Sequence, residues 1–145
     1  MKKFFKNIFK IKDKEKIEKY RNFVEPKIDE FQNIIKTKNT ISFLHYGHLG
    51  DIINSLPVIK ELSKNKACNL FIQKNKKIPK HVVSRDHPFG EVYLSENSIN
   101  KILPLLKRQK FLNKVDIYNN EKIDIDLNFF RELPINFNID SVRWY

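Results

Sequence analysis

Gly47, Gly50 and Asp51 are the residues whose types and spacing point most directly to chemistry. The chain has only three glycines in 145 residues, and two of them stand three apart in one loop between an apolar run and a helical pattern. Glycine there permits a positive φ or a crowded turn, and it leaves main-chain N–H groups open to a polar or anionic ligand. A plain tight turn between strand and helix is the alternative. The loop lacks the third glycine of a dinucleotide fingerprint and the Gly-Lys-Ser/Thr ending of a P-loop.

Asp51 directly follows the second of these glycines and is expected at the cap or in the first turn of the helix, where the helix dipole favours its negative charge. A carboxylate in that place repels a phosphate bound to the same turn. This argues against a simple nucleotide cradle and for a group that accepts a proton from a neutral hydroxyl. A helix cap without any catalytic role is the alternative interpretation.

His45 and His48 surround the same loop and could begin a metal site. A zinc site needs three or four ligands, and Cys68, His81 and His87 have no ligand-like spacing relative to the first pair. We therefore predict no metal site. His48 is expected to lie in the loop and touch substrate hydroxyls, and His45 to pack within the strand.

Asp126 and Arg131 are the candidate binding residues near the end of the chain. Asp124 and Asp126 fall on one face of an alternating strand predicted for 123–130. Either this face is solvated, or its carboxyl end contacts the hydroxyl groups of a ligand. Arg131 follows that strand and could meet a phosphate group of a ligand, although an ordinary surface arginine has the same sequence signature.

Strand-like and helical patterns alternate along residues 40–145. This alternation predicts right-handed crossovers and an α/β, Rossmann-like, doubly wound and mainly parallel sheet with helices on both faces. Residues 114–118 fit either a short strand or the end of the preceding helix. A turn is expected at 87–90, and a kink or restart at Pro57. The predicted strands are 41–46, 67–73, 91–94 and 123–130, and the predicted helices are 52–62 and 95–112.

Residues 1–39 are predicted to form a basic amphipathic helical extension ahead of this domain. Apolar residues at three- and four-residue spacing indicate helices over about 3–24 and 26–36, with Pro26 in the first turn of the second. Two roles remain open for the first helix. It could lie on an anionic membrane with its phenylalanines inserted, or it could pack on the domain.

Composition limits the other function classes. A chain of 145 residues forms about one core, and 28 Lys and Arg against 17 Asp and Glu give a net charge of +11. Lysine accounts for 23 of these cations and arginine for five, and no recognition motif accompanies the charge, so no specific nucleic-acid partner is expected. One cysteine excludes an internal disulfide and fits a reducing cytoplasm. No apolar run is long enough to span a bilayer, which leaves a cytoplasmic protein with the option of a peripheral position on the inner face of the membrane.

Residues 41–62, ISFLHYGHLGDIINSLPVIKEL, resemble the opening strand, loop and helix of family 9 glycosyltransferases, the heptosyltransferases that build the lipopolysaccharide inner core. The shared pattern is an apolar strand, Gly-x-x-Gly-Asp, two or three apolar residues, then a proline and an apolar-x-x-Leu. A looser similarity follows at 122–131, KIDIDLNFFR. Together the two matches cover 32 of the 145 residues.

This resemblance implies an inverting sugar transferase of the two-domain GT-B type. Asp51 stands where the family has the proposed base that activates the acceptor hydroxyl. Residues 40–145 would then be the acceptor-side half, truncated and inactive as a fragment. The resemblance places the substrate loop at Gly47, His48, Leu49 and Gly50, with Asp126 and Arg131 as further acceptor contacts.

The implied substrates are a nucleotide-sugar donor, an ADP-sugar in the family, and a glycan or lipid-linked acceptor. No separate cofactor is implied, because the donor is a co-substrate held mainly by the second domain. The alternative function is a non-catalytic peripheral membrane or anion-binding module that uses the basic N-terminal helix.

Overall fold

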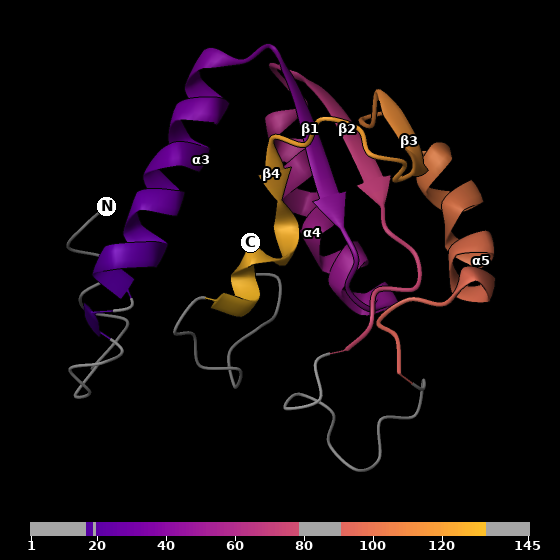
Figure 1. The fold of residues 1–145 in the computed structure, drawn as a ribbon. Helices are drawn as coiled ribbons and strands as arrows, with labels where there is room; N and C mark the ends of the chain where they lie inside the picture. Colours follow the sequence, from indigo (N-terminus) through magenta and orange to yellow (C-terminus); the bar gives the residue numbers. More distant parts are fainter. Residues whose placement is uncertain (1–16, 19, 79–90, 133–145) are drawn as a thin grey trace.

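The structure is a computed structural model that describes residues 17–18, 20–78 and 91–132 (Figure 1). The first predicted helix lies outside these residues up to position 16, as does the turn predicted at 87–90. The described elements are a π-helical turn η1 (Tyr20–Val24), α3 (Glu25–Thr37), β1 (Thr40–His45), α4 (Leu49–Leu62), β2 (Ala67–Ile72), α5 (Glu96–Lys107), β3 (Lys114–Ile117), β4 (Ile125–Asp126) and a 3-10 helix η2 (Leu127–Glu132).

The four described strands form one sheet in the order β3-β2-β1-β4, and all of their pairings are parallel. β1 pairs with β2 along its whole length, from Thr40 with Ala67 to His45 with Ile72. Figure 1 shows α4 behind the sheet, α5 beside β3, and α3 at the opposite edge beside β4. The predicted α/β class and parallel, Rossmann-like sheet flanked by helices are therefore confirmed.

Local sequence signals account for most helix boundaries. Pro26 lies in the first turn of α3, where its missing N–H costs no hydrogen bond. The Ser95 hydroxyl accepts a hydrogen bond from the Ser98 backbone N–H at 3.3 Å and caps α5. α4 continues through Pro57 without interruption, so the second helix start that was considered at this proline does not occur.

Two predicted strands are wrong in whole or in part. Within 91–94, only Val92 makes a bridge, antiparallel to Lys77 in the loop after β2, so this segment closes that loop instead of extending the sheet. The strand predicted for 123–130 is paired only at Ile125–Asp126. There the Asp126 carboxylate accepts the Asn128 backbone N–H at 2.9 Å and turns the chain into η2, although the apolar alternation continues.

The core is built on one side of β1 and β2. Ile41, Phe43, Cys68, Leu70 and Ile72 alternate toward it and are at most 1% exposed. α4 and α5 contribute apolar residues to the same cluster. Residue 114 begins a strand, which settles the choice left open for 114–118.

The described part of the N-terminal extension packs against this domain. The ring of Phe31 on α3 meets the ring of Phe129 edge-on at 5.5 Å, and Val24 is fully buried. Within the described ranges, no helix combines the length and apolar character that a bilayer crossing requires. The membrane role considered for the first helix rests on residues outside those ranges.

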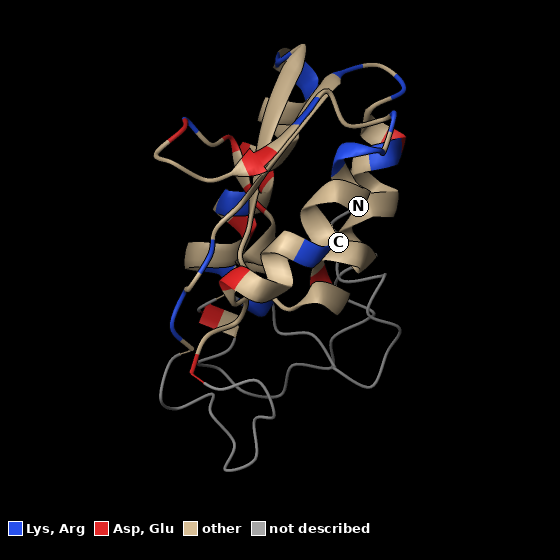
Figure 2. Cartoon of the chain, turned by 90° about the vertical axis from the view of Figure 1, so that its right-hand side faces the viewer, with Lys and Arg blue, Asp and Glu red and all other residues tan. Residues whose placement is uncertain are grey.

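The positive charge of the described chain gathers at the end of the sheet where the strands begin. Figure 2 shows several blue segments at this upper end. Because the strands are parallel, the segments that lead into them lie at one edge. Nine described cations precede a strand or stand at its first residue: Lys36, Lys38, Lys64, Lys66, Lys107, Arg108, Lys110, Lys114 and Lys122.

Asp124 joins the beginnings of β1 and β4 at this basic end. Its carboxylate forms an ion pair with Lys38 and accepts the Ser42 backbone N–H at 3.0 Å. The side chain is only 9% exposed, so the solvated face considered for Asp124 is wrong. Burial opposes its ionisation, but the bonds from Lys38 and Ser42 and the charges of Lys38 and Lys122 outweigh it and lower the pKa of Asp124.

Asp124→Asn is expected to lower the free energy of unfolding at pH 7 by about 1–2 kcal/mol, because it removes a charge-assisted hydrogen bond from a half-exposed lysine and weakens one from the backbone. Because the pKa of Asp124 is lower in the folded chain, its ionised carboxylate stabilises the protein at pH values above the unfolded pKa of about 3.9. This stabilisation is lost as the pH falls through the folded-state pKa. Urea unfolding should therefore show the gap between variant and parent closing toward pH 3. A gap that stays constant with pH would contradict this assignment.

Candidate functional site

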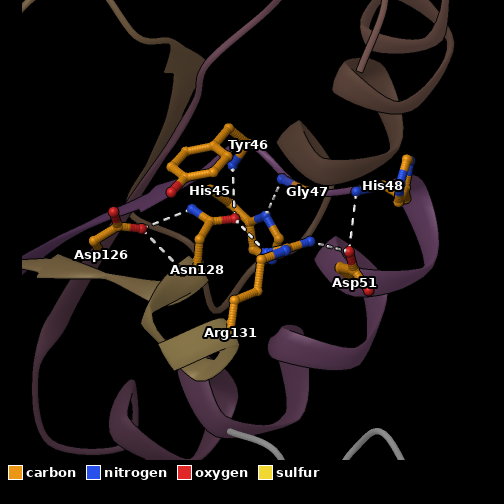
Figure 3. A network of polar contacts seen from close by, with 8 residues as sticks. All are labelled: His45, Tyr46, Gly47, His48, Asp51, Asp126, Asn128 and Arg131. Carbon is orange, nitrogen blue, oxygen red and sulfur yellow. Dashed lines mark hydrogen bonds and ion pairs between the residues drawn. The ribbon is translucent and has the colours of Figure 1, made fainter. Parts of the chain in front are cut away.

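The candidate residues meet where the carboxyl ends of β1 and β4 lie side by side (Figure 3). The chain leaves β1 through α4 toward β2 on one side of β1, while β4 pairs on its other side. This is the point where the strand order reverses, and open α/β sheets bind ligands in the crevice outside such a point. The location alone therefore makes this end of the sheet the first place to look for a ligand site.

Asp51 is held at the start of α4 by two donors on one oxygen. Its Oδ2 accepts the His48 backbone N–H at 3.1 Å and an Arg131 Nη2 hydrogen at 2.6 Å. The Asp51 and Arg131 side chains are 18% and 23% exposed. Among the residues that the structure describes, Oδ1 has no hydrogen-bond donor. The sequence-based expectation of a carboxylate in the first helical turn is thus met.

Arg131 lies on η2, 80 residues further along the chain, and reaches across the switch point to Asp51. Its Nη1 donates to the Asn128 amide oxygen at 3.2 Å. The guanidinium carbon lies 4.4 Å from the ring centre of Phe130 and 4.9 Å from that of Tyr93. Cation–π contacts of this kind hold the guanidinium plane in place.

Asn128 connects this arginine to both strands, and the sequence analysis missed it. Its amide oxygen also accepts the Tyr46 backbone N–H at 3.2 Å, and its Nδ2 donates to Asp126 at 2.7 Å. The residue is 2% exposed. Its signal in the sequence is a single amide inside an apolar run, two residues after Asp126 and three before Arg131. Asp126 therefore supports the network through Asn128.

His45 is fully buried beneath the loop, so the expected packing role is confirmed. Its Nδ1 accepts the Gly47 backbone N–H at 2.9 Å. Burial, with a smaller effect of the Arg131 charge, lowers the pKa of His45 to about 3, and a hydrogen bond with the Asp51 backbone only partly opposes this. The ring is neutral at pH 7 and serves as a hydrogen-bond acceptor that fixes the loop.

The two loop glycines have different reasons to be present. A Cβ on Gly47 would lie 2.7 Å from Asp51 Oδ2 and 2.8 Å from Arg131 Nη2, so the ion pair occupies the space of a side chain. A Cβ on Gly50 would meet nothing within 4 Å. Neither glycine has a positive φ. The crowded-turn interpretation is confirmed for Gly47 and wrong for Gly50.

The remaining predicted residues form the rim of the site. His48 is the N-cap of α4, and its ring meets that of Tyr93 at 5.4 Å. Leu49 is 37% exposed and Gly50 is exposed in the first helical turn. The Tyr46 and Tyr93 rings lie 6.0 Å apart. Aromatic rings therefore stand beside the Asp51–Arg131 pair.

Metal ligands and cavities were the other features considered near this network. In the described ranges, no three His, Cys, Asp or Glu side chains gather as a metal site would require. A cavity of about 200 Å³ between α3, α4 and β4 is lined mainly by apolar side chains, including Phe31, Val58 and Phe129. Neither Asp51 nor Arg131 lines that cavity, but Asp126 and Phe130 do, so it adjoins the polar network from the side of β4 and η2.

Comparison with known proteins gives no relative to guide the assignment. No family model, no curated protein and no solved structure matches the chain.

Gly47→Ala is expected to lower the free energy of unfolding by about 1–3 kcal/mol, because the added methyl group must displace the Asp51–Arg131 ion pair. Gly50→Ala is the matched control, since its methyl group meets open space in a helical turn and should stabilise the protein by up to about 1 kcal/mol. Thermal and urea unfolding of both variants provides the measurement. Equal effects of the two substitutions would show that the crowding at Gly47 does not change the free energy of unfolding.

His45 makes the protein less stable in mild acid. The unfolded chain takes up a proton at this residue below about pH 6.5, whereas the folded chain stays neutral until about pH 3. The stabilisation is present above pH 6.5 and falls by about 2 kcal/mol between pH 7 and pH 5. His45→Asn, whose amide oxygen replaces Nδ1 as acceptor, should show a flatter dependence of the urea midpoint over this range. An unchanged slope would mean that His45 is already protonated in the folded protein.

Proposed function

We propose that this chain is the acceptor-binding half of an inverting glycosyltransferase related to family 9, with Asp51 as the general base. The observation that carries the proposal is the Asp51 carboxylate at the switch point of the sheet, where two donors hold Oδ2 and no described residue donates to Oδ1. The sequence pattern around the loop supports the same assignment. The donor, a nucleotide-sugar such as an ADP-sugar, would bind mainly to a second domain.

The chemistry around Asp51 favours a sugar hydroxyl over a charged group. Arg131 already balances the carboxylate, so the pair carries no net charge toward a ligand. The buried ring of Tyr93 packs on the Arg131 guanidinium, and the partly exposed rings of Tyr46 and His48 lie against Tyr93. The C–H face of a sugar ring packs on aromatic rings, while its hydroxyls bind carboxylate oxygens. A polyol satisfies both kinds of surface.

In the proposed reaction, the acceptor hydroxyl donates its hydrogen bond to Asp51 Oδ1. As the hydroxyl oxygen attacks the anomeric carbon of the donor, its proton passes to Oδ1, and the bond to the nucleoside diphosphate breaks with its electron pair leaving on the phosphate oxygen. A base acts in this way when its oxygen lies about 2.6–3.2 Å from the hydroxyl oxygen. One displacement of this kind inverts the anomeric configuration.

A lipid-linked or glycan acceptor fits this proposal, together with a cytoplasmic location at the inner face of the membrane, where nucleotide-sugars are available. The alternative, a non-catalytic membrane or anion-binding module, depends on basic residues before position 17. Those residues lie outside the described ranges. That alternative also gives no reason for the hydrogen-bonded network of Asn128, Arg131 and Asp51.

Asp51→Asn is expected to reduce sugar transfer by about 10²–10⁴-fold while acceptor binding is retained, because the amide preserves the shape of the side chain and cannot take the proton. Transfer is measured in the complete gene product with labelled ADP-sugar and glycolipid acceptors. Binding of free hexoses and heptoses is measured on residues 1–145 by NMR, at the amides of Gly47 and His48.

Glu96→Gln provides the matched control. It makes the same change of a carboxylate to an amide, in an ion pair with Lys74 on the protein surface. Its transfer rate should match that of the parent. Full turnover by Asp51→Asn would remove Asp51 as the base and with it the proposed mechanism.

A further inference from the structure

Arg131 uses both of its terminal nitrogens in hydrogen bonds within the protein. One terminal nitrogen donates to Asp51 at 2.6 Å and the other to Asn128 at 3.2 Å. The rings of Phe130 and Tyr93 pack against the guanidinium plane at 4.4 and 4.9 Å. An arginine that waits for a substrate phosphate would present its fork to solvent, and here both terminal nitrogens already hold acceptors.

We propose that Arg131 is a positioning residue, which acts on the acceptor through Asp51 and does not bind the acceptor itself. The proposal rests on the proposed function. It reassigns the role that the sequence suggested for Arg131, contact with an acceptor phosphate. Because Arg131 then does not bind a phosphate, the group of the acceptor that we expect at this site is an uncharged hydroxyl.

The geometry shows how the positioning works. An aspartate carboxylate rotates about its Cβ–Cγ bond, and the His48 backbone N–H alone leaves this rotation loosely restrained. The Arg131 donor and the His48 N–H converge on the same oxygen, Oδ2. Oδ1 is then the oxygen that remains for the hydroxyl.

Gly47 lies directly against the Asp51–Arg131 ion pair. The space that a Cβ would fill there is bounded by Oδ2 of Asp51, by Nη2 of Arg131 and by the His45 ring, each within 2.8 Å of the Cβ position. The ion pair therefore packs directly on bare main chain. A lysine at position 131 would keep the charge, but its single nitrogen cannot hold Asp51 and Asn128 in the same fork or stack between two rings.

Asn128 sets the direction of the guanidinium. It is 2% exposed, and it is fixed in turn by Asp126 and by the Tyr46 backbone N–H. The end of β1 and the turn after β4 thus determine together where Arg131 points. This chain of contacts predicts that Arg131 changes the rate of the chemical step and leaves acceptor affinity nearly unaffected.

Steady-state kinetics of the complete gene product tests this prediction. Arg131→Gln is expected to lower kcat by about tenfold or more, because the base is no longer held in the reactive orientation, with the acceptor KM within about twofold of the parent value. Arg131→Lys should recover part of kcat, and added ethylguanidinium should partly restore an Arg131→Ala variant. Arg108→Gln, the same loss of charge at the far end of α5, is the control and should have no effect.

A double-mutant cycle supplies a measurement that does not depend on activity. Arg131→Gln and Asp51→Asn are combined in residues 1–145, and urea unfolding gives the unfolding constant of each variant. If the two side chains act as a pair, the combined effect should be at least about threefold smaller than the product of the single effects. Lys74→Gln with Glu96→Gln is the control cycle on an exposed ion pair, and its effects should multiply.

The outcomes separate the two proposals. A KM that rises about tenfold with kcat unchanged would show that Arg131 binds the acceptor and would overturn the positioning role. Independent effects in the cycle would overturn it as well. Coupling in the cycle together with full turnover of Asp51→Asn would leave the Arg131–Asp51 contact standing and reject the glycosyltransferase mechanism. Coupling, a kcat loss and an unchanged KM support both proposals.

Discussion

The ion pair between Asp51 and Arg131 is the constraint on which the carboxyl end of the sheet depends. It joins the first turn of α4 to η2 across β1 and β4, at positions 80 residues apart. Two half-buried charges are costly to remove from water unless hydrogen bonds satisfy them. The backbone N–H of His48 and the amide of Asn128 supply those bonds. The pair thereby makes the loop, the helix start and the last strand one unit.

The fold explains why these groups meet. Parallel strands in the order β3-β2-β1-β4 bring the carboxyl end of β1 beside that of β4 with no helix between them. The two chain segments then diverge, one into α4 and the other into η2. Bare main chain at Gly47 lets the side chains from both segments close over it. A larger residue would hold the segments apart, so a local choice in the loop decides whether the distant contact forms.

Much of the fold could be predicted from local patterns, and the site only in part. Alternating apolar residues gave β1 and β2, and the glycine-rich loop gave the position of Asp51. The contact between Asp51 and Arg131 could not be predicted, since it depends on strand order. The apolar alternation after Asp126 indicated a longer strand because an Asx turn stops pairing without changing hydrophobicity. Asn128 escaped notice because its partners come from two strands and η2.

The neutral state of His45 follows from the same constraint. A protonated imidazole beneath the loop would place a second positive charge near Arg131 and would lose the acceptor nitrogen that binds the Gly47 N–H. Burial prevents this, because a charged ring surrounded by apolar strand residues is poorly solvated. The loop conformation is thus fixed by two groups. The neutral His45 ring accepts the Gly47 N–H, and Asp51, paired with Arg131, accepts the His48 N–H. A carboxylate balanced in this way offers a ligand little excess charge, which suits the recognition of a hydroxyl group.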